Sequence, residues 1–220
     1  MMNAWFVFVP VMLLTVLNAY SQREAQVDSV AHAICVSLTE IPIDDSLAIM
    51  RVMQRHYVSV SRKIADDEED DFLERLFFRM QRNCPEFKAW LNARDPQKGD
   101  WEIVHERPET LLSRKDCREF SKQKRFKYLE VNGDTVNLEF GRTFWIDRFK
   151  DGTYSKLRIQ WINDCEFEIE FLESNNLSRM KLSNKGDKYR HRIVEKTDKY
   201  YLMFTEIPNM KPYYMFKLYY

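Results

Sequence analysis

Histidines and closely spaced carboxylates are the residues of this sequence best suited to acid–base catalysis or to metal binding. The histidines are scattered along the chain, at His32, His56, His105 and His191. His105 is followed by Glu106, but the second histidine of a zinc-protease helix does not follow at its place in that motif. The histidines therefore predict neither a catalytic site nor a metal site.

Two groups of carboxylates raise the same question. The acidic run Asp66 to Asp71 lacks the glycine and the distal glutamate of a calcium-binding loop, and its negative charge suits the start of a helix. Glu166, Glu168 and Glu170 alternate with apolar residues, which places all three on the solvent-facing side of a strand. The chain has five glycines, and they do not cluster into a phosphate-binding loop. We therefore predict no catalytic residue, no metal ligand and no cofactor.

The four cysteines, Cys35, Cys84, Cys117 and Cys165, are more informative. No two of them have the close spacing of a zinc site, and four cysteines allow three disulfide pairings. The local pairing, Cys35–Cys84 with Cys117–Cys165, keeps each bridge within one half of the chain. Each bridge then closes a loop of roughly 50 residues, which the loop-entropy model values at about 4 kcal/mol. The alternative, four buried thiols in a reducing compartment, requires that the chain is not exported.

The first residues predict export. An apolar run from Phe6 to Leu17 has the length of a signal-peptide core and is too short to cross a bilayer. Ala19 and Ser21 occupy the small-residue positions of a cleavage site, so residues 1–21 are the expected signal peptide and Gln22 the first mature residue. A buried N-terminal helix or an uncleaved anchor are the alternatives, because no Lys or Arg precedes the apolar run. We expect a periplasmic or secreted protein whose mature part has no transmembrane span.

The hydrophobic period divides the mature chain into two domains, so the fold class expected is α+β. Residues 22–94 show helical spacing, with Pro42 breaking the first helix, and predict a small helical bundle clamped by Cys35 and Cys84. Residues 95–116 contain Pro96, Gly99 and Pro108 without sustained periodicity, and are expected to be a linker.

From residue 117 to 220 the period changes to two. A type I′ turn is expected at Asn132-Gly133, and about seven or eight short strands follow one another without a long helix. Such a meander closes most simply as an antiparallel up-and-down β-barrel or a rolled sheet. The last two strands are apolar on both faces, so we expect their outer face to be covered, most simply by the helical domain.

Several segments resemble a known family. They are Cys117-Arg118-Glu119-Phe120, Arg142-Thr143-Phe144, the run from Ile159 to Glu168 that contains W-x-x-x-C-E-F, and Phe171 to Asn176. This pattern resembles small, exported, uncharacterised proteins of Gram-negative Bacteroidota, in which two cysteines frame a lipocalin-like β domain. The resemblance implies a fold and an exported location, but no catalytic residue. Members are sometimes labelled DNA topoisomerase IV, yet this chain has no nucleotide-binding loop and no surplus of positive charge.

Composition limits the classes of partner. The 34 Lys and Arg residues balance 34 Asp and Glu residues, which argues against nucleic acid as a partner. The aromatic content of the β domain leaves two functions open. One is a non-enzymatic binding module that holds a small apolar ligand inside the barrel. The other is a structural or protein-partner module of the cell envelope with a filled barrel. A hydrolase is the third and least favoured alternative. The residues expected to line an apolar cavity are Phe144, Leu157, Ile159, Trp161, Phe167 and Ile169.

Overall fold

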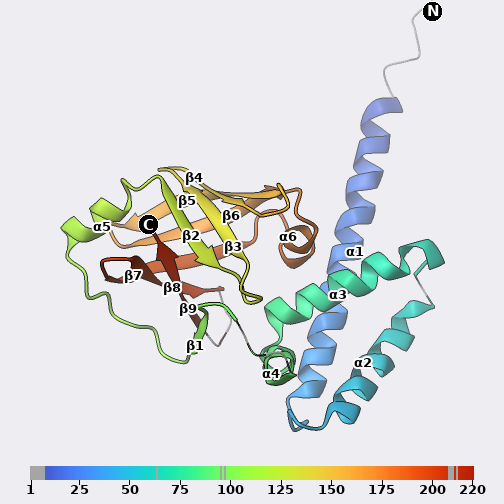
Figure 1. Cartoon of the computed structure of the whole chain (residues 1–220). Coiled ribbons are helices and arrows are strands. Elements are labelled where there is room, and N and C mark those ends of the chain that lie inside the picture. The colour runs from blue at the N-terminus through green and yellow to red at the C-terminus, as the bar shows by residue number, and fades with distance from the viewer. Residues whose placement is uncertain (1–7, 63, 95, 97, 208–210, 212) are drawn as a thin grey trace, which may run out of the picture. The chain divides into compact units, whose positions relative to one another are not determined.

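The computed structural model of the chain describes residues 8–62, 64–94, 96, 98–207, 211 and 213–220. It divides into two compact units, Met1–Trp90 and Leu91–Tyr220. The first unit is helical and the second is built on an antiparallel β-sheet (Figure 1). The predicted α+β class, with helices before the β domain, is therefore confirmed.

The helical unit contains three long helices and two short ones in its described residues. These are α1 (Phe8–Leu38), α2 (Ser46–Ser61), the 3₁₀ turn η1 (Asp66–Glu68), α3 (Glu69–Asn83) and α4 (Pro85–Arg94). The Asp45 side chain caps α2 by accepting a hydrogen bond from the Ala48 amide at 2.9 Å. Acidic residues occupy the first turn of α3, where their negative charge interacts favourably with the positive end of the helix dipole.

Apolar faces of α1 and α3 pack together to form the core of this unit. The buried residues are Val27, Ile34 and Leu38 on α1 and Phe72, Leu76 and Met80 on α3. The Cys35–Cys84 disulfide, with a Cα–Cα distance of 5.4 Å, joins α1 to the end of α3. The predicted clamp on the helical domain is confirmed.

A buried ion pair also joins α1 to α3, and the sequence analysis did not foresee it. Arg79 is 1% exposed, and its guanidinium lies 3.1 Å from the Glu24 carboxylate. Arg75 approaches the same carboxylate at 2.8 Å. Removing either partner of such a pair would leave an uncompensated charge in a dry environment, which would destabilise the pairing of α1 with α3.

The structure describes only part of the expected signal peptide, residues 1–21. Residues 1–7 lie outside the described residues, and α1 begins at Phe8. Cleavage after Ser21 therefore stays a prediction. Among the described residues, no helix combines the length and the hydropathy needed to cross a bilayer.

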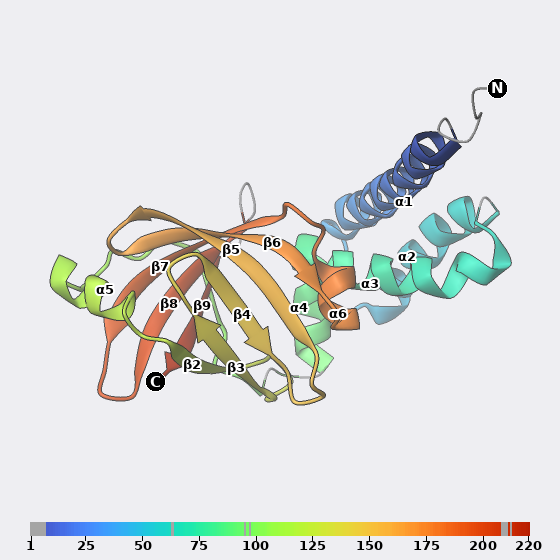
Figure 2. The same ribbon diagram turned by 90° about the horizontal axis from the view of Figure 1, so that it is seen from above.

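The second unit is a closed antiparallel barrel (Figure 2). The described strands are β1 (Glu102–Val104), β2 (Arg125–Leu129), β3 (Thr135–Phe140), β4 (Phe144–Arg148), β5 (Tyr154–Asn163), β6 (Glu166–Ser174), β7 (Lys188–Lys196), β8 (Tyr200–Glu206) and β9 (Tyr213–Tyr219). Each strand from β2 to β9 pairs with the next, and β9 also pairs with β2 at Tyr219 and Lys127. The predicted up-and-down barrel is confirmed.

Two short helices lie at opposite ends of the barrel (Figures 1 and 2). They are α5 (Arg114–Phe120), before the first barrel strand, and α6 (Leu177–Leu182), between β6 and β7. The Cys117–Cys165 disulfide, with a Cα–Cα distance of 5.0 Å, ties α5 to the residue before β6. This confirms the second predicted bridge, and it anchors one end of the barrel covalently.

The segment expected to be a linker belongs to the barrel unit in its described residues. Its strand β1 pairs with β9, at Ile103 opposite Tyr214. Trp101 stacks on Phe216 with ring centroids 4.5 Å apart, and its indole N–H donates to the Leu129 carbonyl at 2.7 Å. Residues 101–104 therefore fill the seam that the single β2–β9 residue pair leaves open.

The same segment also contacts β7 and β8. Thr110 donates its hydroxyl to the Ile193 carbonyl at 2.7 Å, and the Leu111 amide donates to the Val194 carbonyl at 2.9 Å. The Arg107 guanidinium lies 6.0 Å from the ring centroid of Phe204, which is fully buried. We expected a cover over the outer face of the last two strands, and at Phe204 such a contact comes from the segment expected to be a linker.

Gly99 lies close against the backbone of Glu130. A Cβ atom at this position would lie 2.2 Å from the Glu130 carbonyl oxygen, so the backbone there cannot accommodate a side chain without moving. We expect Gly99→Ala to destabilise the barrel by about 1–3 kcal/mol, a usual cost of overpacking. Urea unfolding followed by hydrogen exchange of β2 and β9 peptides measures the change. Gly141→Ala is the matched control, because its nearest atom would lie at an ordinary 3.6 Å. Equal losses in the two variants would contradict the prediction.

Candidate functional site

The interior of the barrel is the first place where a ligand was expected. Leu157, Ile159, Phe167 and Ile169 all belong to one buried core cluster, and Trp161 packs against it. These five predicted residues therefore lie together on the inner face. They contact one another and further aromatic rings.

The sixth predicted cavity residue, Phe144, was assigned to the wrong face. It is 39% exposed, and the Lys156 ammonium lies 4.6 Å from its ring centroid on the outer side. Trp145, which is 3% exposed, takes the inward place and pairs with Leu157 across the sheet. The residues of β4 include apolar side chains at both alternating positions, so alternation alone did not determine which face was dry.

The α5 end of the interior is filled by a side chain that the sequence analysis did not assign to it. Phe120 is fully buried, and its ring centroid lies 5.0 Å from those of Phe126, Phe140 and Tyr201. Phe167 follows at 6.1 Å. Because Cys117 is disulfide-bonded three residues earlier in α5, this ring is held within the barrel.

The α6 end of the interior is polar. Trp145 donates its indole N–H to the Asp147 carboxylate at 2.7 Å. Arg179 on α6 forms an ion pair with Glu130 and a hydrogen bond to the Tyr128 hydroxyl at 3.4 Å. We call Tyr128, Glu130, Asp147 and Arg179 the polar cluster.

Burial perturbs the titration of the polar cluster. It raises the pKa of Asp147 to about 6, although the charge of Arg179 and the hydrogen bond from Trp145 act in the opposite direction. Burial likewise raises the pKa of Tyr128. Asp147 and Tyr128 are shielded from water on the inner face. A general acid or base must reach its substrate, so this arrangement suits a structural role better than catalysis.

His191, on β7, is a further titratable group of the interior. It is 5% exposed and stacks on Trp145 at 5.4 Å, with Phe167 and Phe216 as further neighbours. Its Nδ1 atom has no hydrogen-bond partner among the described residues. Burial lowers its pKa to about 3, against a smaller opposing effect of a hydrogen bond with the Phe204 backbone. The imidazole is therefore neutral at physiological pH.

Glu166 corrects another expectation. It was assigned to the solvent-facing side of β6 together with Glu168 and Glu170, but it is 8% exposed. Arg107 covers it at 3.3 Å and Arg192 at 3.5 Å. The cover comes from the segment before α5, which a strand pattern cannot reveal.

Glu168 and Glu170, which were assigned to the same face as Glu166, are partly buried and paired. Glu170 lies 3.7 Å from Arg158 on β5, and Glu168 lies 2.8 Å from Lys188 on β7. A basic residue and an acidic residue thus pair across β5 and β6 at Arg158 and Glu170. Such ion pairs link neighbouring strands and leave no free carboxylate pair for acid–base work.

A hollow of about 510 Å³ lies on the outer face of the barrel, beside the β2–β9 seam. We call it the outer groove. Its lining residues are Arg125, Phe126, Lys127, Asn137, Leu138, Glu139, Arg148, Tyr219 and Tyr220. Phe126 and Leu138 turn their side chains into the barrel core, so the outer groove presents cations, one carboxylate, one amide and two tyrosines.

One further group of potential metal ligands occurs in the described part of the helical unit. The Glu86 carboxylate lies 3.2 Å from the sulfur of Cys35 and 3.4 Å from that of Cys84. Both sulfurs are joined in the disulfide and cannot act as thiolate ligands, so this group does not form a metal site.

Comparison of the chain with protein-family models, with curated proteins and with solved structures found no match. The resemblance to exported Bacteroidota proteins therefore stays an expectation from sequence.

Proposed function

We propose that this protein is an exported, non-enzymatic binding module whose barrel is a filled scaffold and whose outer surface contacts the partner. The observation that carries the proposal is Phe120, whose ring occupies the barrel interior against Phe126, Phe140 and Tyr201. A lipocalin-like site needs that space for its ligand. With the space occupied, apolar burial of a ligand inside the barrel loses its physical basis.

Further observations support export and the absence of catalysis. Both disulfides are of the kind that persists in an oxidising compartment. Asp147 and His191, two interior groups with perturbed pKa values, are both buried; Asp147 belongs to the polar cluster and His191 contacts aromatic rings. We therefore infer that the partner lies in the cell envelope or outside the cell.

Native mass spectrometry of the purified protein tests the proposal, together with solvent extraction of bound small molecules. We expect the mass of the polypeptide with two disulfides and no adduct. A fluorescent apolar probe should show no saturable binding to the native protein. A stoichiometric co-purified apolar molecule, or saturable probe binding that an interior substitution abolishes, would overturn the filled scaffold in favour of an internal ligand.

A further inference from the structure

The outer groove contains a row of side chains in a regular order. Tyr219 on β9 pairs with Lys127 on β2, Lys127 pairs with Asn137 on β3, and Asn137 pairs with Arg148 on β4. Directly paired residues point to the same face of a sheet, and neighbouring strands lie about 4.8 Å apart. An aromatic ring, a cation, an amide and a second cation therefore follow one another over about 14 Å.

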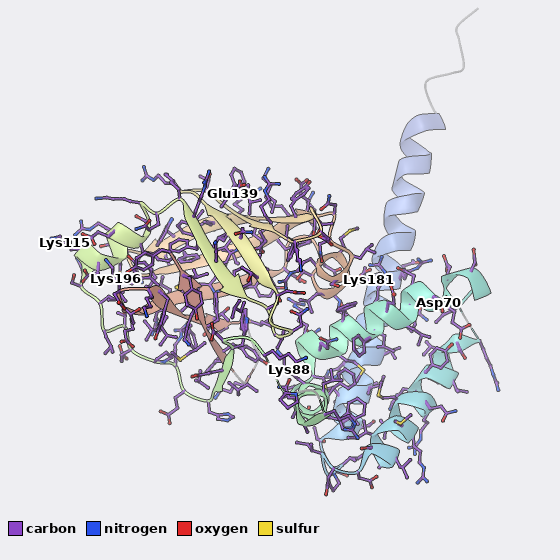
Figure 3. All side chains as sticks on the ribbon, viewed as in Figure 1. Asp70, Lys88, Lys115, Glu139, Lys181 and Lys196 are labelled. Atoms are coloured by element: carbon purple, nitrogen blue, oxygen red, sulfur yellow. A yellow bond between two sulfur atoms is a disulfide. The ribbon has the colours of Figure 1, made fainter. Side chains whose placement is uncertain are left out.

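The charge of the outer groove is unbalanced. Within the described part of the chain, no carboxylate lies within ion-pair distance of Arg125 or Lys127. The one carboxylate of the lining, Glu139 (labelled in Figure 3), lies 3.1 Å from Arg148. Three cations against one carboxylate favour a negatively charged ligand.

The basic character continues along the chain next to the groove. Between residues 114 and 127 the exposed basic side chains are Arg114, Lys115, Arg118, Lys122, Lys124, Arg125 and Lys127. The acidic residues of this segment are already engaged, since Asp116 bonds to Ser113 and Glu119 lies 3.2 Å from Lys196. The positive potential therefore extends beyond the groove, as a ligand longer than one charged group requires.

The two tyrosines are held in place before any ligand arrives. The Tyr220 hydroxyl donates to the Thr197 carbonyl at 2.6 Å, and the Tyr219 hydroxyl bonds to the Asp100 carboxylate. Tyr219 also meets Tyr200 edge to face at 5.7 Å. Fixed rings beside an amide offer a flat surface and hydrogen bonds at a low entropic cost of binding.

We propose that the outer groove binds an anionic oligosaccharide, which deepens the proposed function and rests on it. Lys127 and Arg148 bind the acid groups, Asn137 bonds to sugar hydroxyls, and a sugar ring lies against Tyr219 or Tyr220. A wholly apolar ligand would offer no partner to the three cations of the lining. The long row and the open groove suit a chain of sugar units.

Isothermal titration calorimetry with three defined probes tests the assignment. They are a uronic-acid oligosaccharide, a neutral oligosaccharide of the same length and an oligoglutamate of the same charge. We expect binding of the uronic-acid probe that weakens as salt is added, and binding of the other two that is at least about tenfold weaker, a difference near 1.4 kcal/mol. Equal binding of the neutral probe or of oligoglutamate overturns the assignment, and so does a lack of binding of the uronic-acid probe.

Variants locate the binding. Lys127→Ala and Arg148→Ala should each weaken binding of the uronic-acid probe by about tenfold, the loss of one charge-assisted hydrogen bond. Arg158→Ala is the matched control, because Arg158 is an exposed arginine on the outer face of β5 and lies outside the lining. An equal loss in the control overturns the site. If all probes fail while the barrel carries no ligand, this inference falls and the filled scaffold stands. A co-purified ligand in the interior overturns the proposed function instead.

Discussion

Phe120→Ala is expected to cost the barrel about 3–5 kcal/mol of unfolding free energy, the usual loss for truncating a buried phenylalanine. The ring contacts Phe126, Phe140, Trp161 and Tyr201, and these side chains come from strands on different sides of the barrel. They cannot all move inward to fill the space, since each strand is fixed by its neighbours. A cavity should therefore remain.

The cavity gives this variant a second, opposite readout. An empty apolar cavity in a protein stays dry and binds small apolar molecules. We expect Phe120→Ala to bind benzene or xenon, with a rise in stability as the ligand is added. The native protein should show neither effect. This gain of binding distinguishes a filled barrel from one that is already hollow.

The measurement has to report on the barrel alone, because the chain has two compact units and its unfolding need not be a single transition. Hydrogen exchange of β5 and β6 peptides in increasing urea meets this requirement. Phe144→Ala is the matched control, since Phe144 lies on the outer face and its truncation should cost less than about 1 kcal/mol. A small loss in Phe120→Ala, or binding of the apolar molecule by the native protein, would show that the interior is already empty.

The regular part of the barrel could be predicted from sequence because its signal is local. In β5, Leu157 and Ile159 alternate with charged or polar residues, and the strand has one dry face and one wet face. A turn does lie between β2 and β3, but its hydrogen bond runs from the Gly133 amide to the Glu130 carbonyl at 2.8 Å, so the expected type I′ turn centred on Asn132-Gly133 was wrong. Gly133 instead follows a turn centred on Val131 and Asn132, and its φ of +89° favours glycine. Cysteine spacing likewise favoured one local bridge in each unit, and both bridges form.

The parts that could not be predicted depend on contacts distant in sequence. Arg107 lies 59 residues from Glu166, and it alters the environment of that carboxylate without any mark in the strand pattern. Strand β1 has three residues, too few to show a period. Arg79 follows the helical spacing of a buried face, yet its charge argues for the surface until Glu24, 55 residues away, is known to face it. For the outer groove, the sequence contained the cations but not the register that aligns Lys127 with Asn137 and Arg148.

His191 couples the filled interior to pH. Its pKa in the folded protein is lowered to about 3 from its usual value of 6.5, because burial disfavours the charged imidazolium. Below about pH 6.5 the unfolded chain takes up a proton that the folded protein refuses. The stabilisation is therefore complete above the unfolded pKa and is lost as pH falls, at about 1.4 kcal/mol per pH unit.

Asp147 contributes with the opposite sign. Its pKa is raised from 3.8 to about 6, so the folded protein holds a proton that the unfolded chain releases, and stability falls as pH rises through that interval. The two groups oppose each other between about pH 4 and pH 6. The unfolding free energy of the native protein would therefore vary little with pH in this range, although each group alone produces a steep dependence. Single variants separate the two contributions.

His191→Phe should remove the loss of unfolding free energy that His191 causes as pH falls. Phenylalanine can occupy the space between Trp145 and Phe216 without a proton-binding nitrogen and without an unpaired Nδ1 atom. We expect the unfolding free energy of the variant, compared with that of the native protein, to be about 2.5 kcal/mol higher at about pH 4.5 than at neutral pH. Urea unfolding followed by hydrogen exchange of β7 peptides at both pH values measures this. Asp147→Asn keeps an acceptor for the Trp145 indole and should shift the profile the other way. Parallel profiles for the native protein and His191→Phe would mean that water reaches the imidazole, and a barrel that admits water beside Trp145 is not the filled scaffold proposed here.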